Sequence, residues 1–442
     1  MVGLLALPLE LKLEIFDYLD HRARGNFRLS SPVINSVVQE EMDRRFAERD
    51  HRVTLEHKRL ETLVDIAQDP KMSLLVRRIS IANHVWTAST FITSSFHGYL
   101  DLLLLKHSGQ ARHLLAMAFS HFRNLESIRI TRRFIDPRTL PEWNDTFSGM
   151  PFGETDLDSP LVMLVLLALG DTDIRPTAIR IEDEDTYTPG EQPKRMPIPL
   201  YSFAIPPRSG LPCMLNNLRL LSLGLTVEDE VSVNNLKDLR NDGLVLLEFI
   251  RHLTSLTTLR LSFSEDQMLA SDLLPWICDV SKKGPGAGLR KLQVLELSYI
   301  SVPPRVLTTI CRKSGLEEVS LISPTLLYDP YHKDGFTYNR ESHKIDHWST
   351  FLKRLSKDVF IEVHTLKRFK ISHPAQWREE ALGSIGTTSF RYRPTDVFFK
   401  PGKWSKTTDR EIEYESIGSS QSLHQWLAEV ADHTYIGVDA LG

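Results

Sequence analysis

The chain has few cysteines, no excess of basic residues and no long apolar run. Its three cysteines, Cys213, Cys278 and Cys311, lie far apart, which excludes a disulfide framework or a cysteine-rich zinc site and indicates a reducing compartment. The formal net charge of −4 gives no general attraction to nucleic acid or to a membrane surface. The longest apolar run, Leu161 to Leu169, is too short to span a bilayer. We therefore expect a protein of the cytoplasm, the nucleus or both, with no nucleic-acid or membrane partner.

Catalytic motifs are also missing. The glycine-rich stretch from Lys283 to Gly288 lies between a predicted helix and a predicted strand, which is the reverse of the order in nucleotide-binding loops. His343 and His347 have no obvious third metal ligand, and the acidic run from Asp183 to Asp185 has no apolar surroundings that would separate two pKa values. We expect no cofactor, no metal and no catalytic residue. An enzyme built on an α/β domain stays open, and a deep pocket of perturbed titratable groups would favour it.

The first fifty residues carry the pattern of short amphipathic helices. Leu11, Ile15 and Leu19 follow one another at four-residue spacing, and Phe16 lies one step round the same face. Pro8 suits the first turn of this helix. A later helix is predicted to begin with Ser31 as its cap and Pro32 at its first position, and to bury Ile34, Val37 and Val38.

Two motifs in this region suggest a family. Leu-Pro-x-Glu-Leu-x-x-x-Ile-Phe-x-Tyr-Leu, from Leu7, and then Phe-Arg-Leu-x-Ser resemble the F-box, a module of about three helices that docks on the Skp adaptor of a cullin–RING ubiquitin ligase. The resemblance implies an apolar helical surface that enters a groove of the adaptor. The matching residues are Leu7, Pro8, Leu11, Ile15, Leu19 and Leu29. Arg24, Gly25 and Pro32 depart from the family pattern, which predicts a short or irregular second helix. The alternative is an amphipathic helix that packs on its own domain.

Further along, an apolar-x-x-apolar-x-apolar unit recurs eight times. The last two apolar residues of each unit point to the same side of a strand. The units are Val76-Ile79-Ile81, Leu125-Ile128-Ile130, Pro176-Ile179-Ile181, Leu218-Leu221-Leu223, Leu256-Leu259-Leu261, Leu292-Leu295-Leu297, Leu316-Val319-Leu321 and Leu366-Phe369-Ile371. Helices are predicted between most units, at Gln110–Phe122, Pro160–Leu169, Asp242–Leu253, Asp266–Ser281, Pro304–Lys313 and Asp346–Lys357. This alternation predicts parallel strands with helices on one side.

The repeated unit resembles the irregular leucine-rich repeats that follow F-boxes, in a style typical of fungal proteins, although the usual Asn or Cys after each strand is missing. The expected fold class is α/β, with an F-box-like helical module at 1–48 and a linker helix at 49–73, the end of a helical pattern that starts at Gln39. An irregular leucine-rich-repeat arc then fills 74–373, with a concave parallel sheet and convex helices. Insertions are predicted at 135–159, 182–212 and 323–344, and a C-terminal cap at 374–442, with strands at Ser389–Arg393 and Val397–Lys400 and a helix at Ser419–Ala431. A doubly wound α/β domain is the alternative.

The strand residues that point away from the predicted core are often basic. These candidate substrate-binding residues are Arg78, Arg129, Arg180, Arg260, Arg368 and Lys370, with Glu182, Glu296 and Glu318 among them. Arginine forks suit an acidic or phosphorylated segment of a target protein, whereas the simpler interpretation is a solvated polar face. The leading hypothesis is a non-catalytic substrate receptor that docks a Skp-type adaptor and holds a target. A repeat scaffold with no link to a ligase is the alternative.

Overall fold

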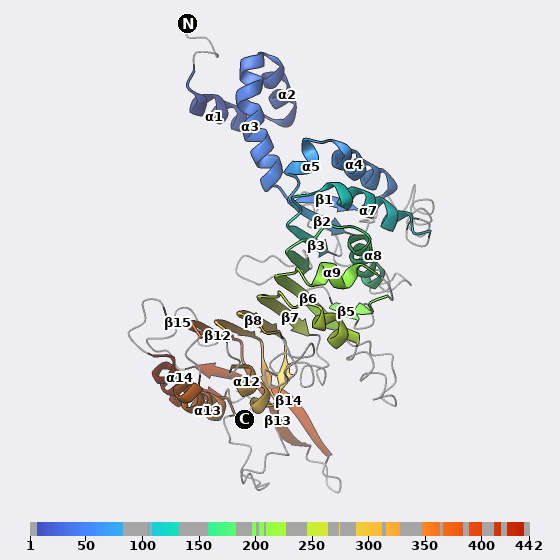
Figure 1. Cartoon of the computed structure of the whole chain (residues 1–442). Coiled ribbons are helices and arrows are strands. Elements are labelled where there is room, and N and C mark those ends of the chain that lie inside the picture. The colour runs from blue at the N-terminus through green and yellow to red at the C-terminus, as the bar shows by residue number, and fades with distance from the viewer. Residues whose placement is uncertain are drawn as a thin grey trace.

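The described part of the protein is elongated, and its first three helices and its last helix lie toward opposite ends (Figure 1). The computed structural model describes residues 7–82, 105, 108–131, 158–182, 197–199, 203–206, 209–226, 245–263, 274, 289–311, 315–327, 347–362, 366–382, 389–399, 411–416 and 422–436. Three helices, α1 (Leu9–Tyr18), α2 (His21–Leu29) and α3 (Pro32–Glu48), form the N-terminal end. A mixed α/β body with a large, mostly parallel sheet follows.

The main sheet has eleven strands in the described part of the chain, ordered β1-β2-β3-β4-β6-β7-β8-β10-β12-β15, with β5 paired to β6. The strands therefore lie side by side in chain order. Neighbours are parallel except β12 and β15, which are antiparallel. The bounds are β1 (His51–Thr54), β2 (Arg78–Ala82), β3 (Ser127–Thr131), β4 (Ala178–Ile181), β5 (Pro197–Pro199), β6 (Leu220–Thr226), β7 (Thr258–Phe263), β8 (Val294–Ser298), β10 (Glu318–Ile322), β12 (Arg368–Ser372) and β15 (Glu411–Glu415).

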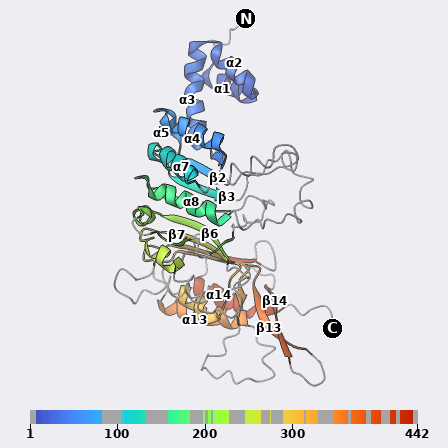
Figure 2. The ribbon, with the colours of Figure 1, turned by 90° about the vertical axis from the view of Figure 1, so that its right-hand side faces the viewer.

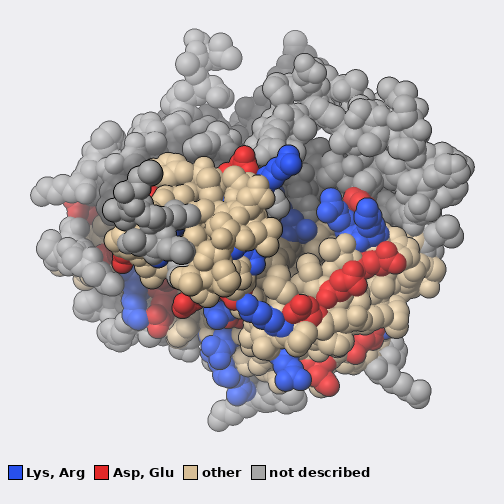
Figure 3. All heavy atoms as spheres, turned by 90° about the horizontal axis from the view of Figure 1, so that it is seen from above, with Lys and Arg blue, Asp and Glu red and all other residues tan. Residues whose placement is uncertain are grey.

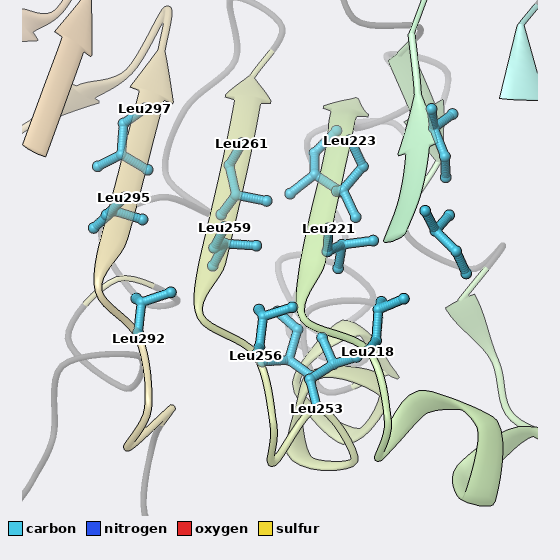
Figure 4. Packing of buried hydrophobic residues seen from close by; sticks show 14 of the residues in the cluster. Leu218, Leu221, Leu223, Leu253, Leu256, Leu259, Leu261, Leu292, Leu295 and Leu297 are labelled. Carbon is cyan, nitrogen blue, oxygen red and sulfur yellow. The ribbon is translucent and has the colours of Figure 1, made fainter. Parts of the chain in front are cut away.

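Each of the eight apolar units forms one parallel strand of this sheet, as predicted. The central residue of every unit pairs with the central residue of the next, so a continuous apolar row crosses the sheet. The row consists of Ile79, Ile128, Ile179, Leu221, Leu259, Leu295, Val319 and Phe369, all buried. Figure 4 shows three units, on β6, β7 and β8, with their leucines aligned from strand to strand. This in-register stacking gives the body one continuous core.

Helices cover one side of the strands, as Figures 1 and 2 show. They are α4 (His57–Gln68), α5 (Met72–Leu75), α7 (Gln110–His121), α8 (Asp158–Gly170), α9 (Leu211–Leu215), α12 (Pro304–Cys311), α13 (His347–Glu362) and α14 (Leu423–Asp432). Residues 245–251 are helical too, inside the helix predicted at 242–253. Most of the helix predicted at 266–281 lies outside the described residues.

The predicted linker helix at 49–73 is wrong in its first part. Helix α3 ends at Glu48, and β1 follows at His51–Thr54 as the first strand of the main sheet, parallel to β2. Val53 and Leu55 alternate with polar residues and are buried in the core, which is the pattern of a strand. The helical pattern resumes only at α4. The segment after α3 is thus part of the body and does not act as a spacer.

A second sheet of five strands, ordered β16-β14-β13-β11-β9, lies beside the end of the first. Its strands are β9 (Ser301–Val302), β11 (Thr325–Leu326), β13 (Ala375–Leu382), β14 (Ser389–Phe399) and β16 (Thr434–Ile436). The chain reaches it through residues of positive φ that follow β8, β10 and β12, namely Tyr299, Ser323 and His373. Main-chain bonds join neighbouring corners, such as Tyr299 N to Ile322 O at 2.8 Å and Ser323 N to Ser372 O at 2.7 Å. These bonds tie the turns that follow β8, β10 and β12 to one another.

The C-terminal region differs from the prediction in four strands. Strand β14 is a single strand where two short ones were expected, and β13, β15 and β16 were not predicted. Ile412 and Tyr414 of β15 are buried, and the tyrosine ring lies 5.6 Å from that of Trp426 on α14. Of the predicted insertions, residues 135–157, 183–196 and 328–344 lie outside the described residues, so their contacts stay predictions.

Candidate functional site

The three N-terminal helices have a core of their own. Phe16, Ile34 and Val38 form a buried cluster that is separate from the core of the body, and Phe27 and Met42 pack against it. The rings of Phe16 and Phe27 lie 6.3 Å apart. Phe16 is therefore the residue of the predicted α1 stripe that faces the module's interior, while the predicted partners on the same stripe are less buried.

Side-chain caps explain where α2 and α3 begin. Asp20 caps α2 by accepting a hydrogen bond from Ala23 N at 2.7 Å. Ser31 caps α3 by accepting from Val33 N at 3.2 Å, and Pro32 occupies the first turn, as predicted. The departures from the family pattern are thus accommodated, and α2 is a regular helix through Gly25. A Cβ at Gly25 would meet nothing within 4 Å.

Three arginines tie the helices to one another. Arg24 of α2 donates to Phe16 O at 3.0 Å and to Asp17 O at 2.9 Å, and its guanidinium lies 5.2 Å from the Phe16 ring centroid. It thereby satisfies main-chain carbonyls at the C-terminal end of α1. Arg28 of α2 donates to Asn35 Oδ1 at 3.1 Å and Gln39 Oε1 at 2.7 Å on α3. Arg45 closes the set from α3 to α1.

Arg45 forms an ion pair with Asp17 at 2.5 Å and also binds Glu41, one turn earlier on α3. Hydrogen bonds from Arg44 and Arg45 lower the pKa of Glu41 from 4.5 to about 2. The charged form of Glu41 thus helps to fix Arg45 where it reaches α1. The angle between the helices depends on these polar contacts because the apolar core of the module is so small.

Large apolar side chains lie on the outside of this module. In the described part of the chain, five of the seven exposed large hydrophobic residues belong to α1–α3, and they are Leu9, Leu11, Tyr18, Leu29 and Val33. Leu29 is 86% exposed and Leu11 44% exposed. Figure 3 looks down on this end, where uncharged side chains form most of the protrusion. Exposed apolar side chains are thus concentrated on this module among the described residues.

The predicted adaptor-binding residues divide into two groups. Pro8, Leu11 and Leu29 are exposed, whereas Leu7, Ile15 and Leu19 are half-buried on or beside α1. None of the six belongs to the buried core of the body. Leu9, Tyr18 and Val33 were missed by the sequence analysis, since a helical stripe does not show which neighbouring side chains a small core leaves uncovered.

Helix α3 joins the module to the body through several contacts. Phe46 packs against the core of the body, and its ring lies 4.2 Å from that of His51 at the start of β1. His51 Nε2 is 2.9 Å from Phe46 O, and burial lowers the pKa of this histidine. Lys71, next to α5, pairs with Asp43 of α3 at 2.8 Å. The N-terminal module is therefore fixed to the first strand of the body and to the start of α5.

The predicted basic residues all occupy the face of the main sheet opposite the apolar row. Arg129 and Arg180 are register neighbours on β3 and β4, and Arg260 and Lys370 follow in the same cross-strand row. Arg78 and Arg368 lie in the adjacent row. Arg78 and Arg180 are exposed, and the other four are half-buried. The sheet thus places all six residues on one face, spread from β2 to β12, with Arg129 and Arg180 as direct neighbours.

The two ends of this face differ in their ion pairs. Arg368 binds Glu415 at 2.8 Å and lies 3.5 Å from Glu413, and Lys370 binds Glu411, so β15 neutralises both cations. Arg129 has Glu182 at 3.8 Å. The sequence analysis missed the acidic strand, although the alternation Glu-Ile-Glu-Tyr-Glu from Glu411 is a period-two signal that could have shown it.

Groups that resemble catalytic or metal-binding sites are few in the described residues. No group of three or more His, Cys, Asp or Glu side chains there could hold a metal ion. Ser356 Oγ lies 2.9 Å from His424 Nδ1, but this serine is buried between α13 and α14, where the contact joins the two helices. His343 and the glycine-rich stretch at 283–288 lie outside the described residues.

Comparisons with known proteins add one match. None of the helices that the structure describes combines the length and the apolar character needed to span a bilayer. No curated protein matches the chain. A family model does match at the N-terminus, over the residues that form α1, α2 and most of α3. Residues 4–45, with their small core and exposed leucines, are therefore an F-box domain.

Proposed function

We propose that this protein is a non-catalytic substrate receptor of an SCF-type, cullin–RING ubiquitin ligase. In this role the F-box domain docks a Skp-type adaptor, and the sheet-containing body holds the target protein for ubiquitin transfer by other subunits. The chain itself supplies no catalytic residue and works in the cytoplasm, the nucleus or both.

The observation that carries the proposal is the division of apolar residues in the F-box domain. Phe16, Ile34 and Val38 are used for its own core, while Leu11 and Leu29 point outward. An exposed leucine is unfavourable in water. Covering it with another surface stabilises the complex by about 25 cal/mol per Å² of apolar area that is buried. A groove of an adaptor that accepts a helical apolar surface is such a cover.

The in-register strands support the second half of the proposal. Eight units with one internal spacing, parallel strands in chain order and helices on one side are features of a leucine-rich-repeat arc. The uneven spacing and the main-chain-tied corners favour the irregular kind associated with F-boxes, including those of fungi. The open face of such an arc is the usual place for a protein partner, and here it carries the six basic residues.

Capture of purified Skp adaptor by the full chain tests the adaptor contact. Leu11→Asp combined with Leu29→Asp should abolish capture, because charged groups would be buried in an apolar groove, while circular dichroism stays unchanged. Leu74→Asp is the matched control, since Leu74 is 47% exposed but lies on α5, outside the F-box domain. Failure of the wild-type chain to bind any Skp adaptor would favour a scaffold with no link to a ligase.

A further inference from the structure

The open face of the main sheet has a basic half and an acidic half. Strands β1 to β4 place Arg52, Arg78, Arg129 and Arg180 on this face, with Asp50 and Glu182 as the acidic groups beside them. Strands β7 to β15 place three cations, Arg260, Arg368 and Lys370, among five glutamates, which are Glu296, Glu318, Glu411, Glu413 and Glu415. Charge therefore changes sign along one continuous surface.

The cations of the acidic half already have partners. Arg260 lies 3.6 Å from Glu296, and Arg368 lies 2.8 Å from Glu415 and 3.8 Å from Glu318. In the basic half, Arg78 and Arg180 are exposed, and neither forms an ion pair with another described side chain. Carboxylates of a partner could therefore form ion pairs with the arginines of β2 and β4, whereas Arg368 on β12 is already paired.

The protein itself shows which chemistry this face accepts. Strand β15 presents Glu411, Glu413 and Glu415 at alternate positions, and all three contact Arg368 or Lys370. Glu182 and Glu296 do the same for Arg129 and Arg260 within the sheet. On this face, guanidinium and ammonium groups therefore bind carboxylates. An arginine can bind a carboxylate with two donors at once.

We propose that the basic half of the open face, around Arg78 and Arg180, binds a short segment of the target protein that is rich in Asp and Glu. The acidic half limits the length of this segment, because a longer polyanion would meet the glutamates of β8, β10 and β15. A nucleic acid, with a charge at every phosphate, fits this sign change poorly. The role of the segment as a target rests on the proposed function, whereas its binding does not.

Fluorescence anisotropy of the full chain with a fluorescein-labelled peptide of alternating glutamate and serine tests the proposal. The double variant Arg78→Ala/Arg180→Ala should raise the Kd about tenfold or more, because it removes two exposed cations that form no ion pair with the side chains that the structure describes. Binding of the wild type should weaken with added salt, since these side chains are exposed. Both arginines are on the surface, so circular dichroism and thermal unfolding should stay unchanged.

Arg368→Ala/Lys370→Ala is the matched control. Arg368 shares its cross-strand row with Arg78, and Lys370 shares its row with Arg180, so the same two charges are lost from the acidic half. Its Kd should change less than about twofold. Equal loss in both double variants, absence of peptide binding, or preference for a phosphoserine peptide or a labelled oligonucleotide would overturn the proposal.

Adaptor capture, measured on the same variants, separates this inference from the proposed function. Arg78 and Arg180 lie outside the F-box domain, so both double variants should capture the Skp adaptor as the wild type does. Peptide binding without adaptor capture would overturn the ligase role and leave the acidic-segment site intact. Adaptor capture without peptide binding would overturn the acidic-segment site and leave the ligase role intact.

Discussion

The F-box domain and the body use leucine in opposite ways. In the body, Leu221, Leu259 and Leu295 stack on one another across parallel strands and are buried. In the F-box domain, Leu9, Leu11 and Leu29 are exposed, and the core consists of one phenylalanine and two β-branched residues. The body has one large continuous core, whereas the core of the F-box domain is small, so we expect the domain to be the less stable of the two.

The difference explains why arginines hold the F-box domain together. Arg24, Arg28 and Arg45 each link two of its helices through directed hydrogen bonds or ion pairs. Such bonds fix geometry while contributing little net free energy each, about 0.5–1.5 kcal/mol for a neutral pair and more for a charged one. The arrangement leaves apolar side chains exposed and still ties the three helices to one another.

Removing one core side chain from each region gives the largest expected contrast. Phe16→Ala should cost about 3–5 kcal/mol, which is comparable to the whole stability of such a small core, so α1–α3 should unfold while the body stays folded. Leu259→Ala should cost about 2–5 kcal/mol. This loss of stability should be spread over several strands, because their side chains form one continuous core. Hydrogen exchange followed by mass spectrometry measures both, through protection of residues 9–48 and of β6 to β8.

Loss of protection confined to residues 9–48 in Phe16→Ala, and spread over the strands in Leu259→Ala, would support two units of different stability. Leu29→Ala is the matched surface control and should change protection by no more than about 0.5 kcal/mol. If Phe16→Ala lowered protection in β6 to β8 as much as Leu259→Ala did, the F-box domain and the body would fold as one unit, and the comparison would fail.

Most of the sheet could be predicted because one rule covers every strand. Ile79 and Ile81 are separated by one residue, as are their counterparts in each unit, and this spacing alone gives the core face and hence the basic face opposite. The strand β1 was missed because Val53 and Leu55 also fit the helical pattern that surrounds them. The strand β15 was missed because its outward residues are charged and its two apolar residues look too few for a core.

Which apolar residues of α1 face inward could not be read from the helix alone. The sequence analysis placed Phe16 and Leu11 on one stripe, but they lie about 140° apart around the helix, and Phe16 is buried whereas Leu11 is 44% exposed. The choice depends on Ile34 and Val38 of α3, which are distant in the sequence, and on the size of the surface that they can cover. An apolar stripe that binds a partner protein has the same helical period as one that packs in the core of its own domain.

Acid should weaken the F-box domain in a way that depends on Glu41. Its pKa is lowered from 4.5 to about 2 in the folded protein, first through the hydrogen bond from Arg44 and then through Arg45. A lowered folded pKa means that the stabilisation is complete above pH about 4.5 and is lost as the pH falls toward 2. Glu41→Gln should therefore be less stable than wild type at neutral pH, and the difference should vanish toward pH 2.

Cleavage by pepsin within residues 9–48, compared between wild type and Glu41→Gln across this pH range, measures the effect. Glu48→Gln is a suitable control because Glu48 also binds Arg44 but is 62% exposed and does not touch Arg45. A constant difference between wild type and Glu41→Gln down to pH 2 would show that the ion pair with Arg45 is not what the charge of Glu41 stabilises.

The smallest expected effects come from two substitutions, one that removes a glycine from the F-box domain and one that introduces a glycine into the body. Each should stabilise its own region. Gly25 lies inside α2 with open space around it, so Gly25→Ala should stabilise the F-box domain by about 0.5–1 kcal/mol by reducing the freedom of the unfolded chain.

Tyr299 has φ 55° at a corner between the two sheets. Left-handed backbone costs a side chain roughly 1–2 kcal/mol, so Tyr299→Gly should stabilise the body by up to about 1 kcal/mol after the entropy of glycine is subtracted. Urea midpoints and local hydrogen exchange measure both changes, and Tyr299→Ala, which keeps the strained backbone and removes the ring, should give no gain. If Tyr299→Gly and Tyr299→Ala both destabilised the body, the corner would depend on the tyrosine ring, and the main-chain bonds between corners would not be enough to hold the turn.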